Sequence, residues 1–386
     1  MWLHTQPEHY FNLLIDALNQ AGDLEYIAGY MRAGSKEYAQ KTPRHSRSVF
    51  LRPVPGWEDG DIPGFQKVHL DWKGDVDPLE ISAGIIAGYG GRTQRDFIHT
   101  LHRRGVPVLM MSDSNIRTQH GRSFRQRMHR RVKKAGLRSI IRDTDCLLTM
   151  NSRGVAYWRY FGAPREKIVV CPFFADYSAV DAGRLAERSA VLEEFKIPER
   201  RMILTAARLV PLKRISTMIQ FFKELQLGKR GWSYVIAGTG PCEAEIRAAA
   251  GEELGKSIFL LDFVQPGPLM KLMCHAHIFA LTSDYEAHGI VIGEATAAGT
   301  PVFASDVCGA AHDLVFEGVS GWRYRNLDLA DWKKKLDLVT RDPGRVEGMR
   351  GSTRRVFEEW FARTNPVTVV DREVHRLLAR KTMGGR

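Results

Sequence analysis

The chain has 386 residues, 44% of them hydrophobic and 26% charged, a composition typical of a globular protein with room for two domains. Its net charge of +12 predicts an anionic partner, but charge alone does not choose among nucleic acid, anionic lipid and a phosphorylated substrate. Its five cysteines are scattered without a CxxC pair, so the sequence indicates neither a disulfide framework nor a zinc site and favours a reducing cytosol.

Strands and helices alternate through the N-terminal half of the sequence. Residues 2–5 predict a strand, and residues 8–19 predict a helix with apolar side chains at helical spacing. Residues 41–65 are rich in proline, glycine and arginine and are expected to form a loop. The other predictions are buried strands at 81–87, 106–111, 146–150 and 168–172 and a helix at 152–161. This alternation predicts a first doubly wound α/β domain, which we place at residues 1–195.

A strongly basic segment lies within this half. Residues 117–142 hold ten lysines or arginines and no acid, and Phe124, Met128, Val132 and Ala135 are spaced by four, four and three. This pattern predicts an amphipathic basic helix. Either its apolar stripe packs on the N-terminal domain while the basic residues are solvated, or the helix rests on an anionic membrane surface and presents a lipid-linked or phosphorylated acceptor.

The C-terminal half repeats the alternation. A charged helical segment at residues 179–198 is expected to link the domains. The predicted strands are 202–206, 232–237, 258–261, 278–281 and 302–304, with helices between them and two final helices at 354–362 and 367–379. We therefore predict a second doubly wound domain at residues 196–365.

Residues 278–305 carry the clearest chemical signal. They form a short apolar strand, a polar turn that contains Glu286 and ends at Gly289, and a helix with Glu294 about a turn and a half from its start. In doubly wound sheets ligands bind at the carboxyl ends of strands, where free N–H groups of a helix favour a phosphate. Two carboxylates there are suited to accept hydrogen bonds from hydroxyls, which indicates a sugar nucleotide. The alternative is that both glutamates are ordinary solvated surface charges.

The same residues resemble a family signature. Glu286, the turn Ala287-His288-Gly289 and Glu294 are followed by Ala-Gly-Thr-Pro-Val. In this pattern the chain resembles the retaining nucleotide-sugar glycosyltransferases of the GT-B fold (glycosyl transferases group 1, family 4-like), whose second glutamate follows the first by eight residues. Ala287 and His288 stand where glycine and an aromatic residue are usual.

The resemblance implies an architecture. It is strongest over residues 200–324. A GT-B protein has two Rossmann-like doubly wound domains that face a crevice. The resemblance therefore implies that residues 1–195 form the acceptor domain, that residues 196–365 bind the donor nucleotide, and that a final helix at about 366–386 packs back on the first domain.

Two basic residues follow the first strand of the C-terminal half. Arg208 and Lys213 stand in Ala-Arg-Leu-Val-Pro-Leu-Lys-Arg, which is similar to the family's Gly-Arg-Leu-(three residues)-Lys pattern with Ala207 in place of glycine. A departing nucleoside diphosphate gains negative charge, and fixed cations stabilise that charge most in the transition state. The resemblance implies this role for both residues. It also assigns Glu286 to the sugar hydroxyls and Glu294 to the ribose.

Further donor contacts are predicted beside these residues. Gly238 and Gly240 lie between a strand and a helix, where glycines allow backbone N–H groups to approach a phosphate, although a GxG is also an ordinary tight turn. His288 either donates to a phosphate oxygen or fills the space of the usual aromatic residue. The remaining predicted contacts are the backbone N–H groups of Gly289 and Ile290 and, for the base, Phe263 and Val264.

The acceptor side is predicted from the N-terminal half. In many relatives a histidine after a strand of the first domain lies against the donor sugar. Here that position falls near Ser112 and Asp113. The role of the histidine is therefore either missing or carried by Asp113.

The resemblance, together with these residues, implies a retaining, metal-independent hexosyltransferase that needs no cofactor. Its donor is expected to be UDP- or GDP-linked, and its acceptor a hydroxyl of a cell-envelope polysaccharide, lipopolysaccharide or glycolipid. The first residues lack the basic start and apolar core of a signal peptide, and no run approaches the ~18 apolar residues of a membrane span. We therefore expect a cytoplasmic protein, or one peripheral on the inner face of the membrane.

Three alternatives stay open. A GT-B sugar-nucleotide epimerase or hydrolase would use the same donor residues. A basic nucleic-acid-binding protein would use residues 117–142, but base-stacking aromatics are sparse there, with Phe124 alone, so we expect no nucleic acid partner. An inactive relative that serves as a scaffold is disfavoured by intact Arg208, Lys213, Glu286 and Glu294.

Overall fold

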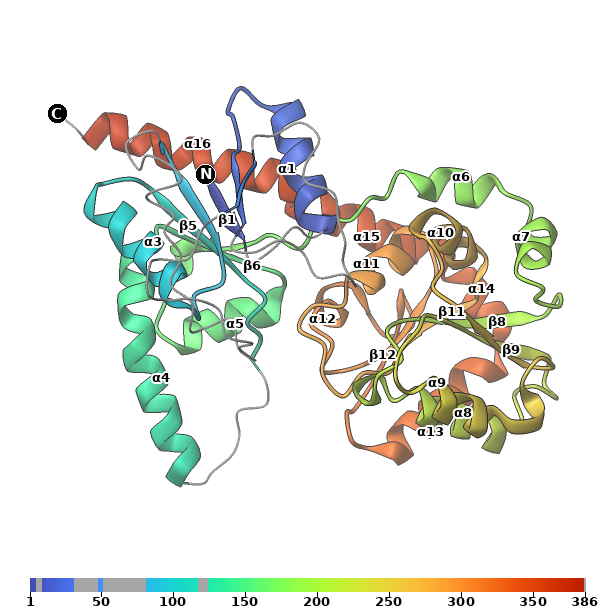
Figure 1. Cartoon of the computed structure of the whole chain (residues 1–386). Helices are drawn as coiled ribbons and strands as arrows, with labels where there is room; N and C mark the ends of the chain where they lie inside the picture. The colour runs from blue at the N-terminus through green and yellow to red at the C-terminus, as the bar shows by residue number, and fades with distance from the viewer. Residues whose placement is uncertain (5–8, 31–47, 51–80, 117–123, 385–386) are drawn as a thin grey trace. The chain divides into compact units, whose positions relative to one another are not determined.

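The computed structural model describes residues 1–4, 9–30, 48–50, 81–116 and 124–384 (Figure 1). Contacts divide the chain into two units. Unit 1 consists of Met1–Ala175 and Arg363–Arg386, and unit 2 consists of Asp176–Ala362.

Unit 1 is built on a parallel sheet of seven strands in the order β3-β2-β1-β4-β5-β6-β7. Its strands are β1 (Trp2–His4), β2 (Ala28–Tyr30), β3 (Ser48–Phe50), β4 (Gly84–Ala87), β5 (Val108–Ser112), β6 (Cys146–Thr149) and β7 (Ile168–Val170). Its helices are α1 (His9–Ala21), α3 (Arg92–Arg103), α4 (Phe124–Asp143), α5 (Ser152–Tyr160), the short 3-10 helix η3 (Arg165–Lys167) and α16 (Pro366–Gly384).

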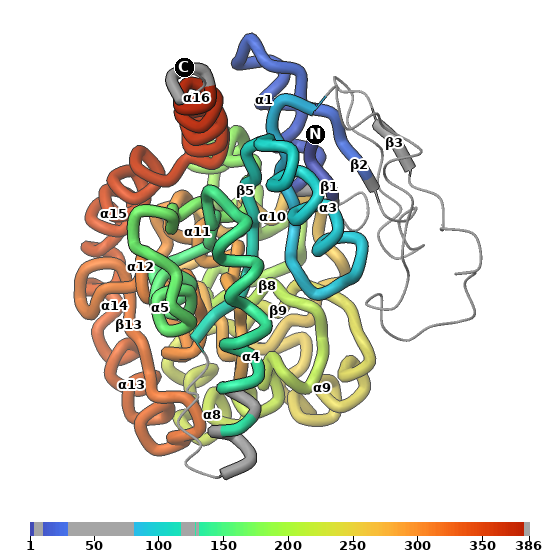
Figure 2. The backbone as a smooth tube through the Cα atoms, turned by 90° about the vertical axis from the view of Figure 1, so that its left-hand side faces the viewer, coloured from blue at the N-terminus to red at the C-terminus, as the bar shows by residue number. Residues whose placement is uncertain are grey.

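Both faces of this sheet are covered by helices. Successive strand residues point to opposite faces, so Leu147 packs with α3, α4 and α5 while Leu148 packs with α1 and α16. Helix α16 contacts α1, so the end of the chain returns to unit 1 (Figures 1 and 2).

Unit 2 has a parallel sheet of six strands in the order β10-β9-β8-β11-β12-β13. Its strands are β8 (Arg201–Ala206), β9 (Trp232–Ala237), β10 (Ile258–Leu261), β11 (Ile278–Leu281), β12 (Val302–Ser305) and β13 (Gly321–Tyr324). Its helices are α6 (Ala179–Leu185), α7 (Arg188–Glu194), η4 (Pro211–Lys213), α8 (Ile215–Glu224), α9 (Glu243–Ala250), η5 (Gly251–Glu253), α10 (Pro266–His275), α11 (Ile290–Ala297), α12 (Ala311–Leu314), α13 (Leu329–Arg341), α14 (Pro343–Gly348) and α15 (Arg350–Thr364).

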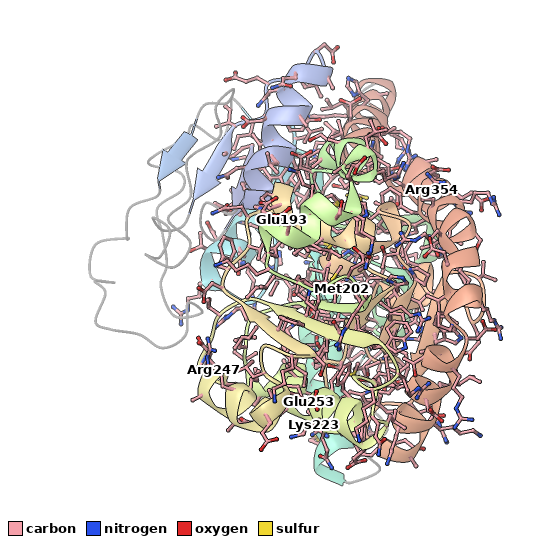
Figure 3. All side chains as sticks on the ribbon, turned by 90° about the vertical axis from the view of Figure 1, so that its right-hand side faces the viewer. Glu193, Met202, Lys223, Arg247, Glu253 and Arg354 are labelled. Carbon is pink, nitrogen blue, oxygen red and sulfur yellow. The ribbon has the colours of Figure 1, made fainter. Side chains whose placement is uncertain are left out.

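The sheet of unit 2 is also enclosed. Helices α8, α9 and α13 form a core on one face, and α10, α11 and α15 form a core on the other. Figure 3 shows the result: Met202 of β8 lies inside the unit, whereas Lys223, Arg247 and Arg354 lie on the surrounding helices. The predicted doubly wound α/β class is therefore confirmed in both units.

The structure differs from the predicted elements at several places. Strand β3 lies at Ser48–Phe50, inside the segment expected to be loop, and the rest of residues 41–65 falls outside the described residues. Residues 176–195, expected in the first domain, belong to unit 2, because apolar side chains of α6 and α7 pack beside α10. Strands β2 and β13 were not predicted.

The strand order of unit 2 reverses at its centre. Strand β8 pairs with β9 on one side and with β11 on the other, and all these pairs are parallel. The connections after β8 and β11 therefore leave the sheet in opposite directions. Such a switch point opens a crevice at the carboxyl ends of the two strands, where ligands bind in open α/β sheets.

Candidate functional site

Two of the predicted charged residues, Lys213 and Glu286, meet at this switch point. Arg208 and Lys213 follow β8, and the loop 282–289, which contains Glu286, follows β11. The Nζ atom of Lys213 donates to Oε2 of Glu286 in a close ion pair, with side chains 18% and 22% exposed. The cation and the acid that the sequence assigned to the donor thus lie against each other.

Backbone and side-chain hydrogen bonds join the two loops that carry this pair. Thr282 donates through Oγ1 to the carbonyl of Lys213 at 2.8 Å, and the N–H of Asp284 donates to the carbonyl of Leu212 at 2.8 Å. On its other side the loop is joined to the segment after β12, because the N–H of Gly309 donates to the carbonyl of Glu286 at 3.0 Å. Glu286 is therefore held from two directions.

The glycines after β9 allow a close approach of two loops. A Cβ on Gly238 would lie 2.0 Å from the carbonyl oxygen of Ala207, and one on Gly240 would lie 2.5 Å from that of Leu209. The N–H of Gly238 donates to the carbonyls of Leu261 and Asp262 at 3.3 and 3.2 Å. It is thus engaged within the protein instead of being free for a phosphate. These glycines position the loop that carries the exposed Arg208.

The start of α11 is formed by a buried turn. Gly289 has a φ of +87°, and a Cβ there would lie 3.1 Å from Cγ of Glu286, so the turn requires a glycine. His288 is buried, and burial lowers its pKa to about 4, which leaves a neutral imidazole at neutral pH. Its carbonyl accepts from the N–H of Ala310 at 2.7 Å. Ile290 is the first residue of the helix.

Glu294 differs from Glu286 in its surroundings. It lies on α11 and is half-buried, and burial raises its pKa from 4.5 to about 7. Glu286 instead has a cation as its neighbour. The site therefore contains one carboxylate paired with a lysine and one whose ionisation is costly until a ligand supplies hydrogen bonds.

The other predicted donor residues follow β10. Phe263 is exposed and Val264 is half-buried, at the carboxyl end of this edge strand. Their placement leaves an aromatic ring and an apolar side chain accessible beside the loop of Gly238.

The predicted acceptor residues lie in unit 1, at the carboxyl end of β5. Ser112 is buried and donates through Oγ to Ser114 Oγ at 2.7 Å, while Asp113 is exposed. Ser114 Oγ lies 3.1 Å from the hydroxyl of Tyr89, which lies 2.7 Å from that of Tyr157. The sequence did not reveal this chain of hydroxyls, although Tyr89 comes two residues after the end of β4.

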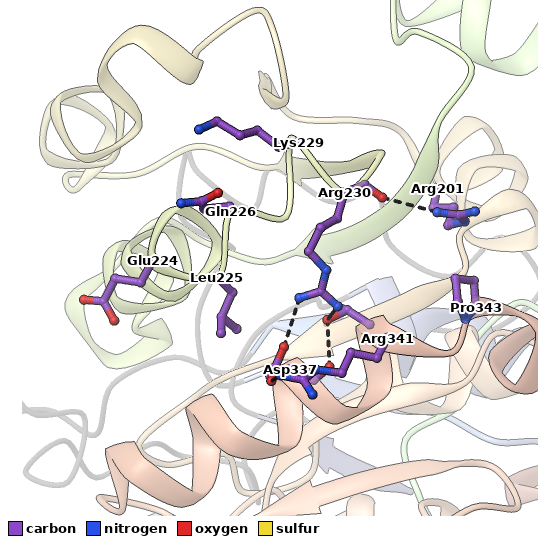
Figure 4. A pocket seen from close by; sticks show the side chains of 10 residues that line it. Arg201, Glu224, Leu225, Gln226, Lys229, Arg230, Asp337, Arg341 and Pro343 are labelled. Carbon is purple, nitrogen blue, oxygen red and sulfur yellow. Dashed lines mark hydrogen bonds and ion pairs between the residues drawn. The ribbon is translucent and has the colours of Figure 1, made fainter.

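A cavity of about 680 Å³ lies elsewhere in unit 2 (Figure 4). It is at the amino ends of β8 and β9, where Arg230 donates to Asp337 at 2.9 Å and Arg341 pairs with the same carboxylate at 2.6 Å. The predicted site residues do not line it. Its basic side chains complement the carboxyl-terminal ends of α8 and α13.

Among the residues that the structure describes, no three histidine, cysteine or acidic side chains are grouped so as to hold a metal ion. Over the same residues, no helix combines the length and the apolar character needed to cross a membrane.

Comparisons with known proteins show which proteins this chain is similar to. Residues 189–356 match the family model described as "Glycosyl transferases group 1". The chain is 26% identical over 315 residues to the alpha-D-kanosaminyltransferase of Streptomyces kanamyceticus, covering 77% of this chain and 80% of that protein. It is 27% identical over 354 residues to the GDP-mannose-dependent alpha-(1-6)-phosphatidylinositol monomannoside mannosyltransferase of Mycolicibacterium smegmatis, covering 86% and 85%. Several other curated relatives are matched over about half of their length.

The solved structures supply the fold. HepE of Anabaena, determined in complex with UDP, matches with a TM-score of 0.68 and 14% identity, over 98% of this chain and 100% of that one. At that identity the likeness shows the fold alone, which is GT-B.

Proposed function

We propose, from the premise that the chain belongs to the glycosyl transferases group 1 and has the GT-B fold, that it transfers a hexose from a nucleoside-diphosphate sugar to an acceptor hydroxyl with retention of configuration. The observation that carries the proposal is the pairing of Lys213 with Glu286 at the switch point of unit 2. A cation and a carboxylate at one point match a ligand that carries a diphosphate beside sugar hydroxyls.

The two members of this pair have different tasks during transfer. Lys213, together with Arg208 in the same loop after β8, stabilises the negative charge that develops on the departing diphosphate. Glu286 accepts hydrogen bonds from sugar hydroxyls and fixes the ring at the point of bond cleavage. Lys213 must therefore turn from Glu286 toward the diphosphate when the donor binds.

Glu294 holds the ribose of the donor. Its raised pKa of about 7 reflects a carboxylate with too little hydration. Two ribose hydroxyls that donate to it replace the missing water, so the donor and the ionised form of Glu294 stabilise each other. Phe263 and Val264 follow the edge strand β10 and serve the base.

Retention follows from attack on the face that the diphosphate leaves. The acceptor oxygen bonds to the anomeric carbon as the bond from that carbon to the phosphate oxygen breaks. The acceptor proton passes to the departing phosphate oxygen. In this scheme the protein supplies orientation and charge, and we propose that no metal or cofactor is needed.

Helix α4 supports an acceptor at an anionic membrane. Its last turns are buried through Leu137 and Ile140, whereas Met128 and Val132 are 45% and 64% exposed. In Figure 1 the helix extends beyond the rest of unit 1. The apolar stripe is therefore not packed on the domain there. Residues 117–123 of the basic segment lie outside the described part of the chain.

Basic side chains flank this exposed stripe. Arg131, Lys134 and Arg138 are exposed on the same helix. Each such charge near an anionic leaflet contributes about 1 kcal/mol. The Mycolicibacterium relative is named for a phosphatidylinositol glycolipid. We therefore include a lipid-linked acceptor of the cell envelope, and a peripheral place on the membrane, in the proposal.

The test of the reaction is a panel of UDP- and GDP-sugars. A donor that binds raises the melting temperature by mass action, and transfer is then followed with an acceptor glycolipid. Retained configuration of the product supports the proposal. Release of nucleoside diphosphate at the full rate without any acceptor would indicate a hydrolase or epimerase instead.

The test of the membrane contact is vesicle sedimentation at low and high salt. Binding to vesicles with anionic lipid is expected to fall at 1 M salt, where the Debye length is about 3 Å. It is also expected to fall when Arg131, Lys134 and Arg138 are changed to Ser. Equal binding to neutral vesicles, or no loss in the variant, would contradict the membrane contact and leave the donor chemistry intact.

A further inference from the structure

A second ion pair lies beside Lys213 and Glu286. The Nη1 atom of Arg214 is 3.5 Å from Oδ2 of Asp284, and each side chain is 31% exposed. Arg214 follows Lys213 directly, and Asp284 stands two residues before Glu286. The turn after β8 and the loop after β11 are thus joined by two neighbouring cation–acid pairs.

Arg214 occupies a backbone position that disfavours its residue type. Its φ of +54° and ψ of 31° are left-handed, where a side chain with a Cβ is strained and glycine is not. This conformation joins η4 to α8 and leaves the carbonyls of Leu212 and Lys213 to accept hydrogen bonds from the β11 loop. Glycine would satisfy the turn without strain, so the turn itself does not require the arginine side chain, and the ion pair with Asp284 is a contact that glycine would not make.

Asp284 is itself fixed from another direction. Its carbonyl accepts a hydrogen bond from Nδ2 of Asn326 at 3.2 Å, and its N–H donates to the carbonyl of Leu212. The carboxylate that faces Arg214 therefore belongs to a loop segment anchored at both its N–H and its carbonyl. Because this segment is anchored, its ion pair with Arg214 can fix the position of the β11 loop relative to the turn after β8.

We infer that Arg214 is a positioning residue for the reaction, a claim that rests on the proposed function. In the structure Lys213 pairs with Glu286, but during transfer Lys213 faces the diphosphate and Glu286 faces the sugar. The first ion pair between the loops is then lost. The pair of Arg214 with Asp284 remains and keeps Glu286 in register with Lys213 while both bind the donor.

The test uses variants that separate the side chain from the backbone strain. Arg214→Gly removes the ion pair but suits the left-handed turn, so the melting temperature is expected to stay within a few degrees of wild type. Gln226→Gly is the matched control. Gln226 also has a left-handed φ, of +51°, but it lies at the amino end of the sheet, beside the cavity of Figure 4.

The kinetic expectation is specific to positioning. Arg214→Gly is expected to lower kcat by about ten- to a hundredfold, with less than a threefold change in the donor KM, because a slightly misplaced group mainly affects the reacting geometry. Arg214→Lys is expected to recover part of the rate. Asp284→Asn is expected to match Arg214→Gly, and the double variant to lose no more than either one. Gln226→Gly is expected to keep the wild-type rate.

Three kinetic outcomes would overturn the inference. The first is a wild-type kcat in Arg214→Gly, and the second is an additive loss of kcat in the double variant. The third is a rise in the donor KM of Arg214→Gly alone, not shared by Asp284→Asn, since that pattern means that Arg214 binds the donor itself. Hydrogen exchange of loop 282–289 in saturating UDP or GDP supplies a readout that needs no turnover. Faster exchange in Arg214→Gly than in Gln226→Gly supports the inference even if no sugar is transferred, whereas equal exchange contradicts it.

Discussion

The carboxyl ends of the two sheets present different chemistry. In unit 2 the loops after β8 and β11 are joined by ion pairs, Lys213 with Glu286 and Arg214 with Asp284. In unit 1 the loops after β4 and β5 are joined by neutral hydroxyls, with Ser114 between Ser112 and Tyr89. Burial raises the pKa of Tyr89, so its hydroxyl stays protonated at neutral pH.

This difference separates two requirements of glycosyl transfer. A leaving diphosphate needs fixed positive charge, because charge stabilisation is usually the largest catalytic contribution. A neutral acceptor hydroxyl needs orientation by donors and acceptors that do not compete for that charge. Under the proposed function, the same parallel-sheet plan would therefore serve as an electrostatic site in unit 2 and as a hydrogen-bonding site in unit 1.

Lys213→Ala tests the electrostatic half and has the largest expected effect. Both kcat and kcat/KM are expected to fall together by about ten- to a thousandfold, since the interaction is strongest in the transition state. Steady-state transfer assays measure this loss. Lys229→Ala, at an exposed lysine beside the cavity of Figure 4, is the control and is expected to be neutral. Turnover near the wild-type rate in Lys213→Ala would remove Lys213 from the site.

Glu294→Gln tests how much folding stability is lost, at different pH values, when the half-buried carboxyl group of Glu294 ionises. The pKa of Glu294 is about 7 in the folded protein and 4.5 without the fold, so the folded state binds the proton more tightly. The fold therefore loses stability as the pH rises from 4.5 to 7, and the full cost, about 3 kcal/mol, is present above pH 7.

The Gln substitution removes this cost. Denaturant unfolding without ligand is expected to show Glu294→Gln more stable than wild type at pH 7.5 and similar to it at pH 4.5. Glu245→Gln, at an exposed glutamate of α9, serves as the control. The same difference in the free energy of unfolding at both pH values would mean that burial does not raise the pKa of Glu294.

Nucleotide binding separates the roles of the two glutamates. Glu294→Gln is expected to weaken UDP or GDP binding by about tenfold, the effect of a lost charge-assisted hydrogen bond. Glu286→Gln is expected to spare that binding, because its carboxylate otherwise competes with the diphosphate for Lys213, and to impair sugar transfer. Calorimetry on both variants measures this contrast. Equal weakening in the two would show that the roles are wrongly assigned.

Tyr89→Phe tests the hydroxyl half and has the smallest expected effect. Loss of one neutral hydrogen bond, about 1 kcal/mol, is expected to raise the acceptor KM by about fivefold and to leave the donor KM unchanged. Initial rates at varied acceptor concentration measure this. Tyr160→Phe, at an exposed tyrosine of α5, is the control. A change in the donor KM instead of the acceptor KM would mean that Tyr89 contributes to donor binding and not to acceptor binding.

The sequence predicted the elements whose signal is local. The strand, turn and helix at residues 278–297 are each marked by an apolar run, a glycine or a helix stop, and all appear in the structure. Strands β2, β3 and β13 were missed because each is short and contains a glycine or a polar residue instead of a continuous apolar run. The boundary at residue 195 differs from that of the structure because α6 and α7 pack on α10, a contact that no local pattern encodes.

The residues of the site could be predicted from the sequence, but the ion pairs between them could not. Parallel-sheet topology brings Lys213 and Glu286 to one edge although they are 73 residues apart. Which cation meets which acid depends on backbone geometry, such as the left-handed Arg214, that composition does not reveal. Backbone geometry also determines that the N–H of Gly238 donates to carbonyls within the protein, which the sequence does not reveal. The exposure of Met128 and Val132 also could not be predicted, since the stripe fits a core and a membrane equally.

The central claim is that the donor diphosphate is bound by the charged end of unit 2. Calorimetric titration of UDP and GDP into wild type, Lys213→Ala and Tyr89→Phe tests it most directly, because the nucleoside diphosphate carries the charge of the leaving group. The account predicts binding at least about tenfold weaker in Lys213→Ala and unchanged in Tyr89→Phe. Equal affinity in wild type and Lys213→Ala, or a loss confined to Tyr89→Phe, would contradict it.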